Sequence, residues 1–279
     1  MNTIYQWFAE PLGYPFIQQA LLIGIVVATV CATLSCYLVL KGWSLMGDAI
    51  SHAVLPGIVL AYLLAIPLGI GAFFSGIFCA VAVGYLKEHS RLKEDTVMGI
   101  VFSGMFAIGL VMFVKVESEQ HLSHIIFGNL LGMLQSEMYQ SLAISLVVLV
   151  VILCRRRDLL LFCFDLSHAR TVGLNISVLH YGLLTLLALV IVSAIQVVGV
   201  ILVIAMLITP GITGYVLSKR FDRMLIIAIF TAVNSAFWGV FLSFYFDVAT
   251  GPCIVVLQAL FFLFALAVTF FHKNRVMLG

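Results

Sequence analysis

The strongest constraint on this chain is a series of nearly unbroken apolar runs, each long enough to cross a lipid bilayer. A helix needs about 20 apolar residues to span the hydrocarbon core. Because the runs are continuous and do not alternate at every second residue, a transmembrane β-barrel is not expected. Only 9% of the residues are charged, whereas a soluble domain carries about 25%. We therefore predict an all-α fold, a polytopic transmembrane helical bundle.

The apolar runs predict about eight or nine spans in a single transmembrane domain over residues 1–279. The candidate spans cover residues 16–40, 45–65, 68–86, 96–115, 138–154, 176–195, 199–217, 224–245 and 253–271. Prolines are expected to kink two of them, Pro56 in the second and Pro210 in the seventh, and to interrupt these spans. No polar segment is long enough for a nucleotide-binding fold, and a phosphate-binding Gly-x-x-x-x-Gly-Lys loop is absent. If transport is driven by ATP, the ATPase is another chain.

Basic residues fall at alternate connections between the spans. They are Lys41; Lys87, Arg91 and Lys93; Arg155–Arg157 with Arg170; Lys219, Arg220 and Arg223; and Lys273 with Arg275. The positive-inside rule places these connections in the cytoplasm. The N-terminus is then predicted to lie outside and the C-terminus in the cytoplasm.

Small residues at four-residue spacing mark faces where transmembrane helices approach closely. Three successive spans carry such rows: Ala20, Gly24, Ala28 and Ala32; Ala49, Ala53, Gly57 and Ala61; and Ala72, Gly76, Ala80 and Gly84. We expect a tightly packed N-terminal bundle. The six cysteines lack Cys-x-x-Cys spacing and are interpreted as small apolar packing residues.

Two ionisable residues stand inside the second span, in the segment LMGDAISHAVLPG at 45–57. Asp48 and His52 are four residues apart, so they lie on one helix face, about 6 Å apart along the axis. Such residues are costly in lipid and tend to face an interior or a water-filled path. Carboxylate and imidazole together suit Mn²⁺, Fe²⁺ or Zn²⁺. Pro56, four residues further on, frees a backbone carbonyl close to the pair.

Other readings of the pair stay open on spacing alone. Asp48 could cap the start of the span while His52 is a satisfied core residue, or the two could relay protons. Two side chains are also too few for a tight metal site, and a two-fold dimer would supply two more.

Six segments, in order along nearly the whole chain, resemble the ABC-3 family, the membrane permeases of bacterial ABC importers for manganese, zinc and iron. They are GDAISHAVLPG (47–57), KEDTVMGIVFSGMFAIGL (93–110), HIIFGNLLGM (124–133), FDLSHARTVGLN (164–175), VVGVILVIAMLITPGITGY (197–215) and DVATGPCIVV (247–256). The resemblance implies the ABC importer permease fold, in the bacterial cytoplasmic membrane. It also implies that Asp48 and His52 contact the transported metal, with no permanently bound cofactor.

The partners implied by the resemblance are a second permease copy or a sister permease, two cytoplasmic ATPase subunits and an extracytoplasmic metal-binding protein. Residues 164–175 match the family's coupling helix, with Asp165, Ala169 and Gly173 as the positions assigned to ATPase coupling. The residues themselves fit a short helix, because Asp165 can cap its start and Gly173 can end it.

Other polar residues rank lower as parts of the path or its mouth. Gln196 and Asp247 lie at turns, where Asp247 could attract cations or cap the next helix. Glu117, Glu119, His121 and His124 cluster in the longest outer loop, which could dock a binding protein or concentrate metal.

The rival functions are a permease for a metal chelate or haem and a proton- or sodium-coupled carrier that acts alone. An intramembrane metalloenzyme would need a set such as His-Glu-x-x-His, which is absent. We expect no enzymatic activity in this chain.

Overall fold

The computed structural model describes residues 10–114, 130, 132–133 and 135–277, and within this part every regular element is a helix. The helices in chain order are α2 (Pro15–Lys41), α3 (Met46–Ala53), α4 (Leu55–Leu63), α5 (Leu68–His89), α6 (Glu94–Val114), α8 (Gln135–Cys154), α9 (Arg156–Phe164), α10 (Leu166–Thr171), α11 (Ile176–Val198), α12 (Val200–Leu217), α13 (Phe221–Phe246) and α14 (Thr250–Met277). The predicted all-α class is confirmed.

Nine segments of the described chain are long and apolar enough to cross a membrane. They coincide with the nine candidate spans, and α3 with α4 together form the second. Many large apolar side chains on α5, α6 and α14 are exposed. Since a helix bundle in lipid has no need to hide apolar side chains from its surroundings, this outward apolar surface agrees with a polytopic membrane protein.

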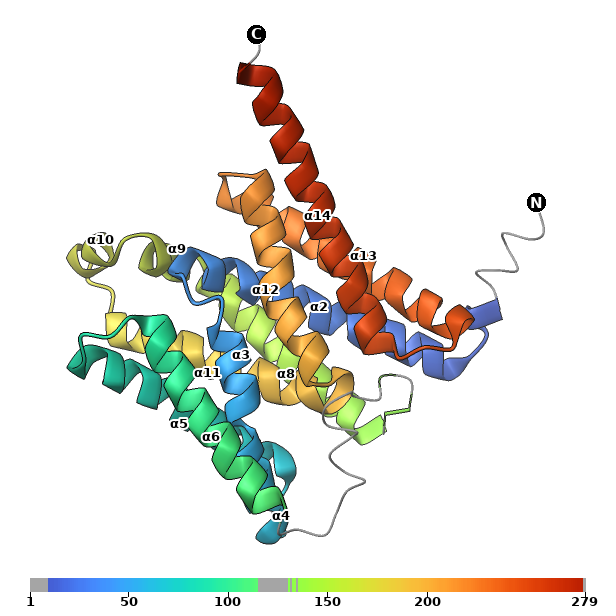
Figure 1. Ribbon diagram of the computed structural model, residues 1–279, viewed down its shortest axis with the longest axis horizontal. Helices are drawn as coiled ribbons and strands as arrows, with labels where there is room; N and C mark the ends of the chain where they lie inside the picture. Colours follow the sequence, from blue (N-terminus) through green and yellow to red (C-terminus); the bar gives the residue numbers. More distant parts are fainter. Residues whose placement is uncertain (1–9, 115–129, 131, 134, 278–279) are drawn as a thin grey trace.

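Helix α2 forms the centre of the bundle and packs against α8, α11, α12 and α13. Its predicted row of small residues is buried, Ala20, Ala28 and Ala32 completely. In Figure 1, α13 and α14 lie on one side of α2, α3 to α6 lie on the other, and α12 crosses α2. The bundle therefore places the broken second span between α5 and α6 on one flank and α11 and α12 on the other.

The predicted interruption of the span over 199–217 is wrong, because α12 runs through Pro210 as one helix. The buried hydroxyl of Ser35 on α2 bonds to the backbone of this stretch. It accepts a hydrogen bond from the Gly211 N–H at 3.0 Å and lies 3.2 Å from the carbonyl oxygen of Ile208, to which it donates. The carbonyl that Pro210 itself leaves without a donor is that of Met206, so Ser35 stabilises the backbone on either side of the proline and does not replace the missing bond.

Helix α9 was not predicted. The basic stretch after Cys154 was interpreted as a loop, but the chain turns at Arg155 and continues as helix to Phe164. Its buried face, with Leu159 and Phe162, packs against the bundle. These apolar residues stand among arginines, so the segment is too short and too charged to register as a span.

Candidate metal-path site

The second span breaks between α3 and α4, at Val54. Pro56 lies in the first turn of α4, and proline has no N–H to offer the carbonyl of His52 four residues earlier. From the neighbouring helix α5, the Ser75 hydroxyl donates to the carbonyl of Ala53 at 2.7 Å. The break predicted at Pro56 is thus confirmed, and α5 stabilises the backbone beside it.

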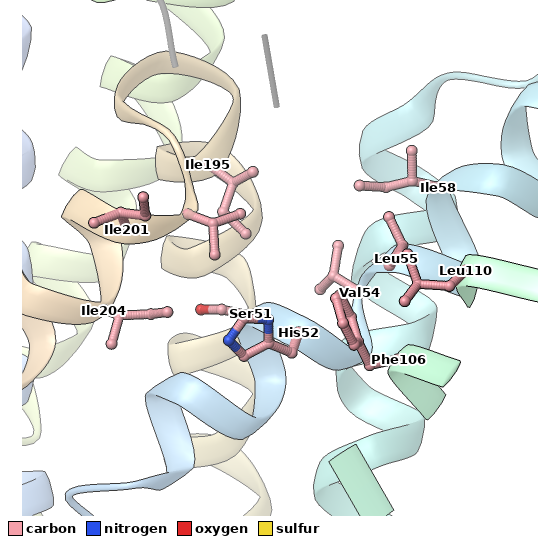
Figure 2. A pocket seen from close by; sticks show the side chains of 11 residues that line it. Ser51, His52, Val54, Leu55, Ile58, Phe106, Leu110, Ile195, Ile201 and Ile204 are labelled. Atoms are coloured by element: carbon pink, nitrogen blue, oxygen red, sulfur yellow. The ribbon is translucent and has the colours of Figure 1, made fainter. Parts of the chain in front are cut away.

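A cavity of about 360 Å³ lies beside the break. Its walls come from α3, α4, α6, α11 and α12, and among the described residues that line it His52 alone is ionisable. Figure 2 shows the His52 ring projecting from α3 toward Ile204 of α12. On α6, the rings of Phe102 and Phe106 lie 5.9 Å and 5.2 Å from the His52 ring, centroid to centroid. The imidazole is therefore held at the edge of an apolar space.

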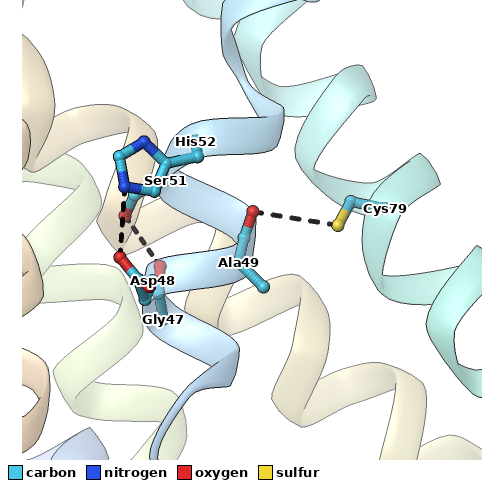
Figure 3. A network of polar contacts seen from close by, with 6 residues as sticks. All are labelled: Gly47, Asp48, Ala49, Ser51, His52 and Cys79. Carbon is cyan, nitrogen blue, oxygen red and sulfur yellow. Dashed lines mark hydrogen bonds and ion pairs between the residues drawn. The ribbon is translucent and has the colours of Figure 1, made fainter. Parts of the chain in front are cut away.

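Asp48 and His52 contact each other directly. The His52 Nε2 atom lies 3.2 Å from Asp48 Oδ1, and the side chains are 33% and 29% exposed, respectively. Figure 3 shows the pair on one side of α3 and Cys79 of α5 on the other, where its thiol lies 3.9 Å from the carbonyl oxygen of Ala49. The prediction that both groups share one helix face is confirmed.

The geometry of α3 tests whether Asp48 caps the start of the span. The N-cap position of α3 is Leu45, and no side chain caps this helix end. Asp48 stands inside the first turn, where a carboxylate is favoured by the helix dipole, and its side chain pairs with His52. Asp48 is therefore not the capping residue. The half-exposed pair presents one oxygen and one nitrogen donor.

In the part of the chain that the structure describes, no further metal ligands gather beside the pair. Among the described residues, no three His, Cys, Asp or Glu side chains gather closely enough to hold an ion. Outside the spans, burial raises the pKa of the Cys163 thiol to about 12, while nearby Lys41 acts in the opposite direction. A thiolate ligand is thus not available there at neutral pH. On its own, the pair offers one oxygen and one nitrogen donor, too few for a tight metal site.

Close glycine contacts fix the position of the broken span. Gly57 of α4 and Gly71 of α5 meet backbone to backbone. On α6, a Cβ at Gly109 would lie 2.9 Å from the ring of Pro56, and on α3, a Cβ at Gly47 would lie 3.1 Å from Leu207 of α12. The broken span that carries the pair is therefore approached closely by α5 and α6 at α4 and by α12 at α3.

The predicted short helix over 164–175 is confirmed as α10. Asp165 is its N-cap, and its carboxylate accepts from the amides of Ser167 at 2.8 Å and His168 at 3.0 Å. At the other end Gly173 has a φ of +83°, and the Leu174 amide donates to the carbonyl of Ala169 at 3.1 Å. This is the Schellman arrangement that a left-handed glycine permits.

The family model described as the ABC 3 transport family matches residues 13–269. The chain belongs to the ABC 3 transport family. It is thus a multi-pass membrane protein of an ABC importer, and the apolar helices of the described part agree with its multi-pass character.

Relatives with known names agree with this membership. The "Chelated iron transport system membrane protein YfeD" of Yersinia pestis is 62% identical over 266 residues, 95% of this chain and 90% of the relative. The "Manganese transport system membrane protein MntB" of Synechocystis is 54% identical over 262 residues, 94% of this chain and 86% of the relative. A solved structure, "PsaBC from Streptococcus pneumoniae in complex with Fab", has a TM-score of 0.85 at 36% identity, covering 94% of this chain and 95% of that one.

Among the other candidate residues named in the sequence analysis, those that the structure describes lie on different elements. Ala169 is completely buried, so it packs α10 onto its own chain. Asp247 is exposed and has a left-handed backbone at the C-cap of α13. Gln196 is in the last turn of α11, with its side chain outside the described part. The four loop residues Glu117, Glu119, His121 and His124 lie outside the described residues.

The sequence analysis missed the surroundings of the pair. Ser51 lines the cavity, and its hydroxyl donates within α3 to the Gly47 carbonyl at 2.7 Å. Phe102 and Phe106 of α6, whose rings contact His52, were also not among the predicted site residues. No local pattern signals a contact between side chains on two different helices.

Proposed function

We propose that this chain is the permease subunit of an ABC importer that moves a divalent transition-metal ion, Mn²⁺ or Fe²⁺ before Zn²⁺, into the cytoplasm. The observation that carries the proposal is the Asp48–His52 pair, at 3.2 Å, on a span that is broken at Val54. The names of the manganese and iron relatives support the choice of cargo. The cargo is a substrate in transit, and no resident cofactor is proposed.

The metal path requires a partner. Because one chain offers a single carboxylate and imidazole, we infer that a second copy, or a sister permease, brings an equivalent pair to the same axis. Two-fold symmetry would supply two oxygens and two nitrogens, a set that suits Mn²⁺ and Fe²⁺. The cavity beside His52 would then belong to the space through which the ion passes.

The driving force comes from other chains in this proposal. We infer one transmembrane domain over 1–279, cytoplasmic ATPase subunits that bind near α10, and an extracytoplasmic protein that delivers the metal. Helix α10 suits a lever because both its ends are fixed, by the Asp165 cap and by Gly173. The buried Ala169 would transmit movement of α10 to the bundle. Asp247 and Gln196 are kept as candidates for the path or its mouth.

We place the N-terminus outside and the C-terminus in the cytoplasm. Supporting this, Lys41, Lys87 and Arg170, which are far apart in sequence, border one pocket, so these basic helix ends meet on one side of the bundle. Fusion of alkaline phosphatase and of green fluorescent protein to the C-terminus tests the orientation. Fluorescence without phosphatase activity is expected, and the reverse would overturn the assignment.

A permease for a chelate or haem is the second candidate, favoured by the name of the chelated-iron relative. Such a cargo carries its own ligands and would not depend on the Asp48–His52 pair. Transport of free Mn²⁺ and of an iron chelate by the same variants distinguishes the two. A carrier that acts alone would import metal without any ATPase.

The test is uptake into liposomes that contain this chain with its ATPase and binding protein. ATP-dependent Mn²⁺ accumulation is expected to fall at least tenfold in Asp48→Ala and in His52→Ala, while the complexes still assemble. Thr185→Ala is the control, because its hydroxyl bonds only within α11 and does not border the cavity, and it should transport normally. Uptake unchanged in both site variants would reject the site, and uptake without the ATPase would reject the importer.

A further inference from the structure

A second cavity, of about 710 Å³, lies at the opposite end of α3 from the break, among the basic helix ends. It is bordered by the ends of α2 and α5, by α10 and by the start of α11. We call it the basic pocket, after Lys41, Lys87 and Arg170, three cations contributed by three different helices. Among the described side chains that line it, none is an Asp or a Glu. Lys41 and Arg170 therefore give this part of the pocket a positive charge that favours an anion.

The start of α11 adds a second anion-binding element. Ile176 and Ser177 are its first two residues, and both line the pocket. The Asn175 side chain accepts from the Val178 amide at 3.2 Å. Within the described chain, the amides of Ile176 and Ser177 make no backbone bond. Free amides at the start of a long helix bind phosphate readily.

The floor of the pocket is apolar and aromatic. Trp43 and Phe162 are 3% and 1% exposed, and the Lys41 Nζ atom lies 4.1 Å from the Phe162 ring centroid. The His180 ring meets Trp43 edge-on at 5.0 Å. At the rim, Tyr181 is exposed, as is usual for tyrosine at a membrane interface. The pocket thus combines a cationic rim with a surface suited to a glycerol or acyl group.

We propose that the basic pocket binds the phosphate headgroup of an anionic phospholipid, such as phosphatidylglycerol or cardiolipin. Basic pockets between helices at the cytoplasmic face recognise such headgroups. A phosphate held there would be shared by Lys41 of α2 and Arg170 of α10, so a lipid would join the short helix α10 to the bundle. The site is separate from the metal path, and its test needs neither metal nor ATP.

The experiment is native mass spectrometry of the delipidated full-length protein after addition of phosphatidylglycerol, cardiolipin or phosphatidylcholine. The wild type should retain the anionic lipids and not phosphatidylcholine. Lys41→Gln/Arg170→Gln should bind them about tenfold or more weakly, since each basic residue near anionic lipid contributes measurably. The control is Lys219→Gln/Arg223→Gln, which removes the same charge at exposed positions away from the pocket.

Equal retention of anionic lipid by the two double variants would overturn the proposal. A melting temperature of the wild type that rises with phosphatidylglycerol, and not with inorganic phosphate or phosphatidylcholine, would support it without relying on any variant. If inorganic phosphate alone gives the same rise, the ligand is free phosphate and the lipid assignment fails. If added ATPase subunit displaces the retained lipid, the pocket belongs to the subunit interface, and the proposal fails as well.

Discussion

Gly57 and Gly71 face each other across α4 and α5, and the place that a Cβ on either would occupy falls on the carbonyl of the other. No side chain separates the two backbones at this point. The contact lies immediately after the break at Val54. It therefore fixes the position of α4, the half of the span that follows Asp48 and His52. A reciprocal glycine contact is the device that lets membrane helices approach most closely.

Replacing either glycine by alanine should destabilise the bundle. Gly57→Ala and Gly71→Ala each force α4 and α5 apart, at a cost of roughly 1–3 kcal/mol for overpacking. Thermal unfolding of the purified protein in detergent measures the effect. Gly104→Ala is the control, since a Cβ at Gly104 on α6 meets nothing within 4 Å. Melting temperatures that match the control would show that the contact is not needed.

Loss of the Ser35 hydroxyl should weaken α12 at Pro210. Ser35→Ala leaves the buried Gly211 amide without its acceptor, which costs about 1–3 kcal/mol. Thr185→Ala removes a hydroxyl that bonds only to the preceding turn of its own helix, and it should change stability little. Unfolding monitored by circular dichroism compares the two, and an equal effect would contradict the role given to Ser35.

Changes at the ends of α10 should separate ATP hydrolysis from transport. Asp165→Ala removes the N-cap, worth about 1 kcal/mol, and Gly173→Ala forces a side chain into the left-handed region, at roughly 1–2 kcal/mol. Both should raise the number of ATP molecules hydrolysed per metal ion imported. Asp165→Asn keeps a capping oxygen, and Gly182→Ala enters open space on α11, so both should remain coupled. Normal coupling in Asp165→Ala and Gly173→Ala would reject α10 as the lever.

The sequence predicts the membrane spans well because each needs only a local apolar run, and the break at Pro56 because proline acts on its own backbone. Caps such as Asp165 and Gly173 are local too. Contacts between helices that are far apart in the sequence could not be predicted from such local patterns. The partner of Gly57, the helix that continues through Pro210 with help from Ser35, and the aromatic neighbours of His52 all come from helices elsewhere in the chain.

The basic pocket illustrates the same limit at the level of sites. From the sequence, Lys41, Lys87 and Arg170 each indicated only which end of a span faces the cytoplasm. Their convergence follows from how α2, α5 and α10 end together, which no local pattern encodes. The Asp48–His52 pair was recognisable only because both groups lie one helical turn apart on a single helix.

The most direct test of the metal path is pulsed electron paramagnetic resonance of Mn²⁺ bound to the assembled complex. Nuclear modulation from nitrogen reports imidazole bound to the ion. We predict histidine nitrogen coupling in the wild type and in Thr185→Ala, whose hydroxyl bonds only within α11, and its loss in His52→Ala. Mn²⁺ bound without nitrogen coupling in the wild type, or with the same coupling in His52→Ala, would contradict the assignment of this pair to the metal.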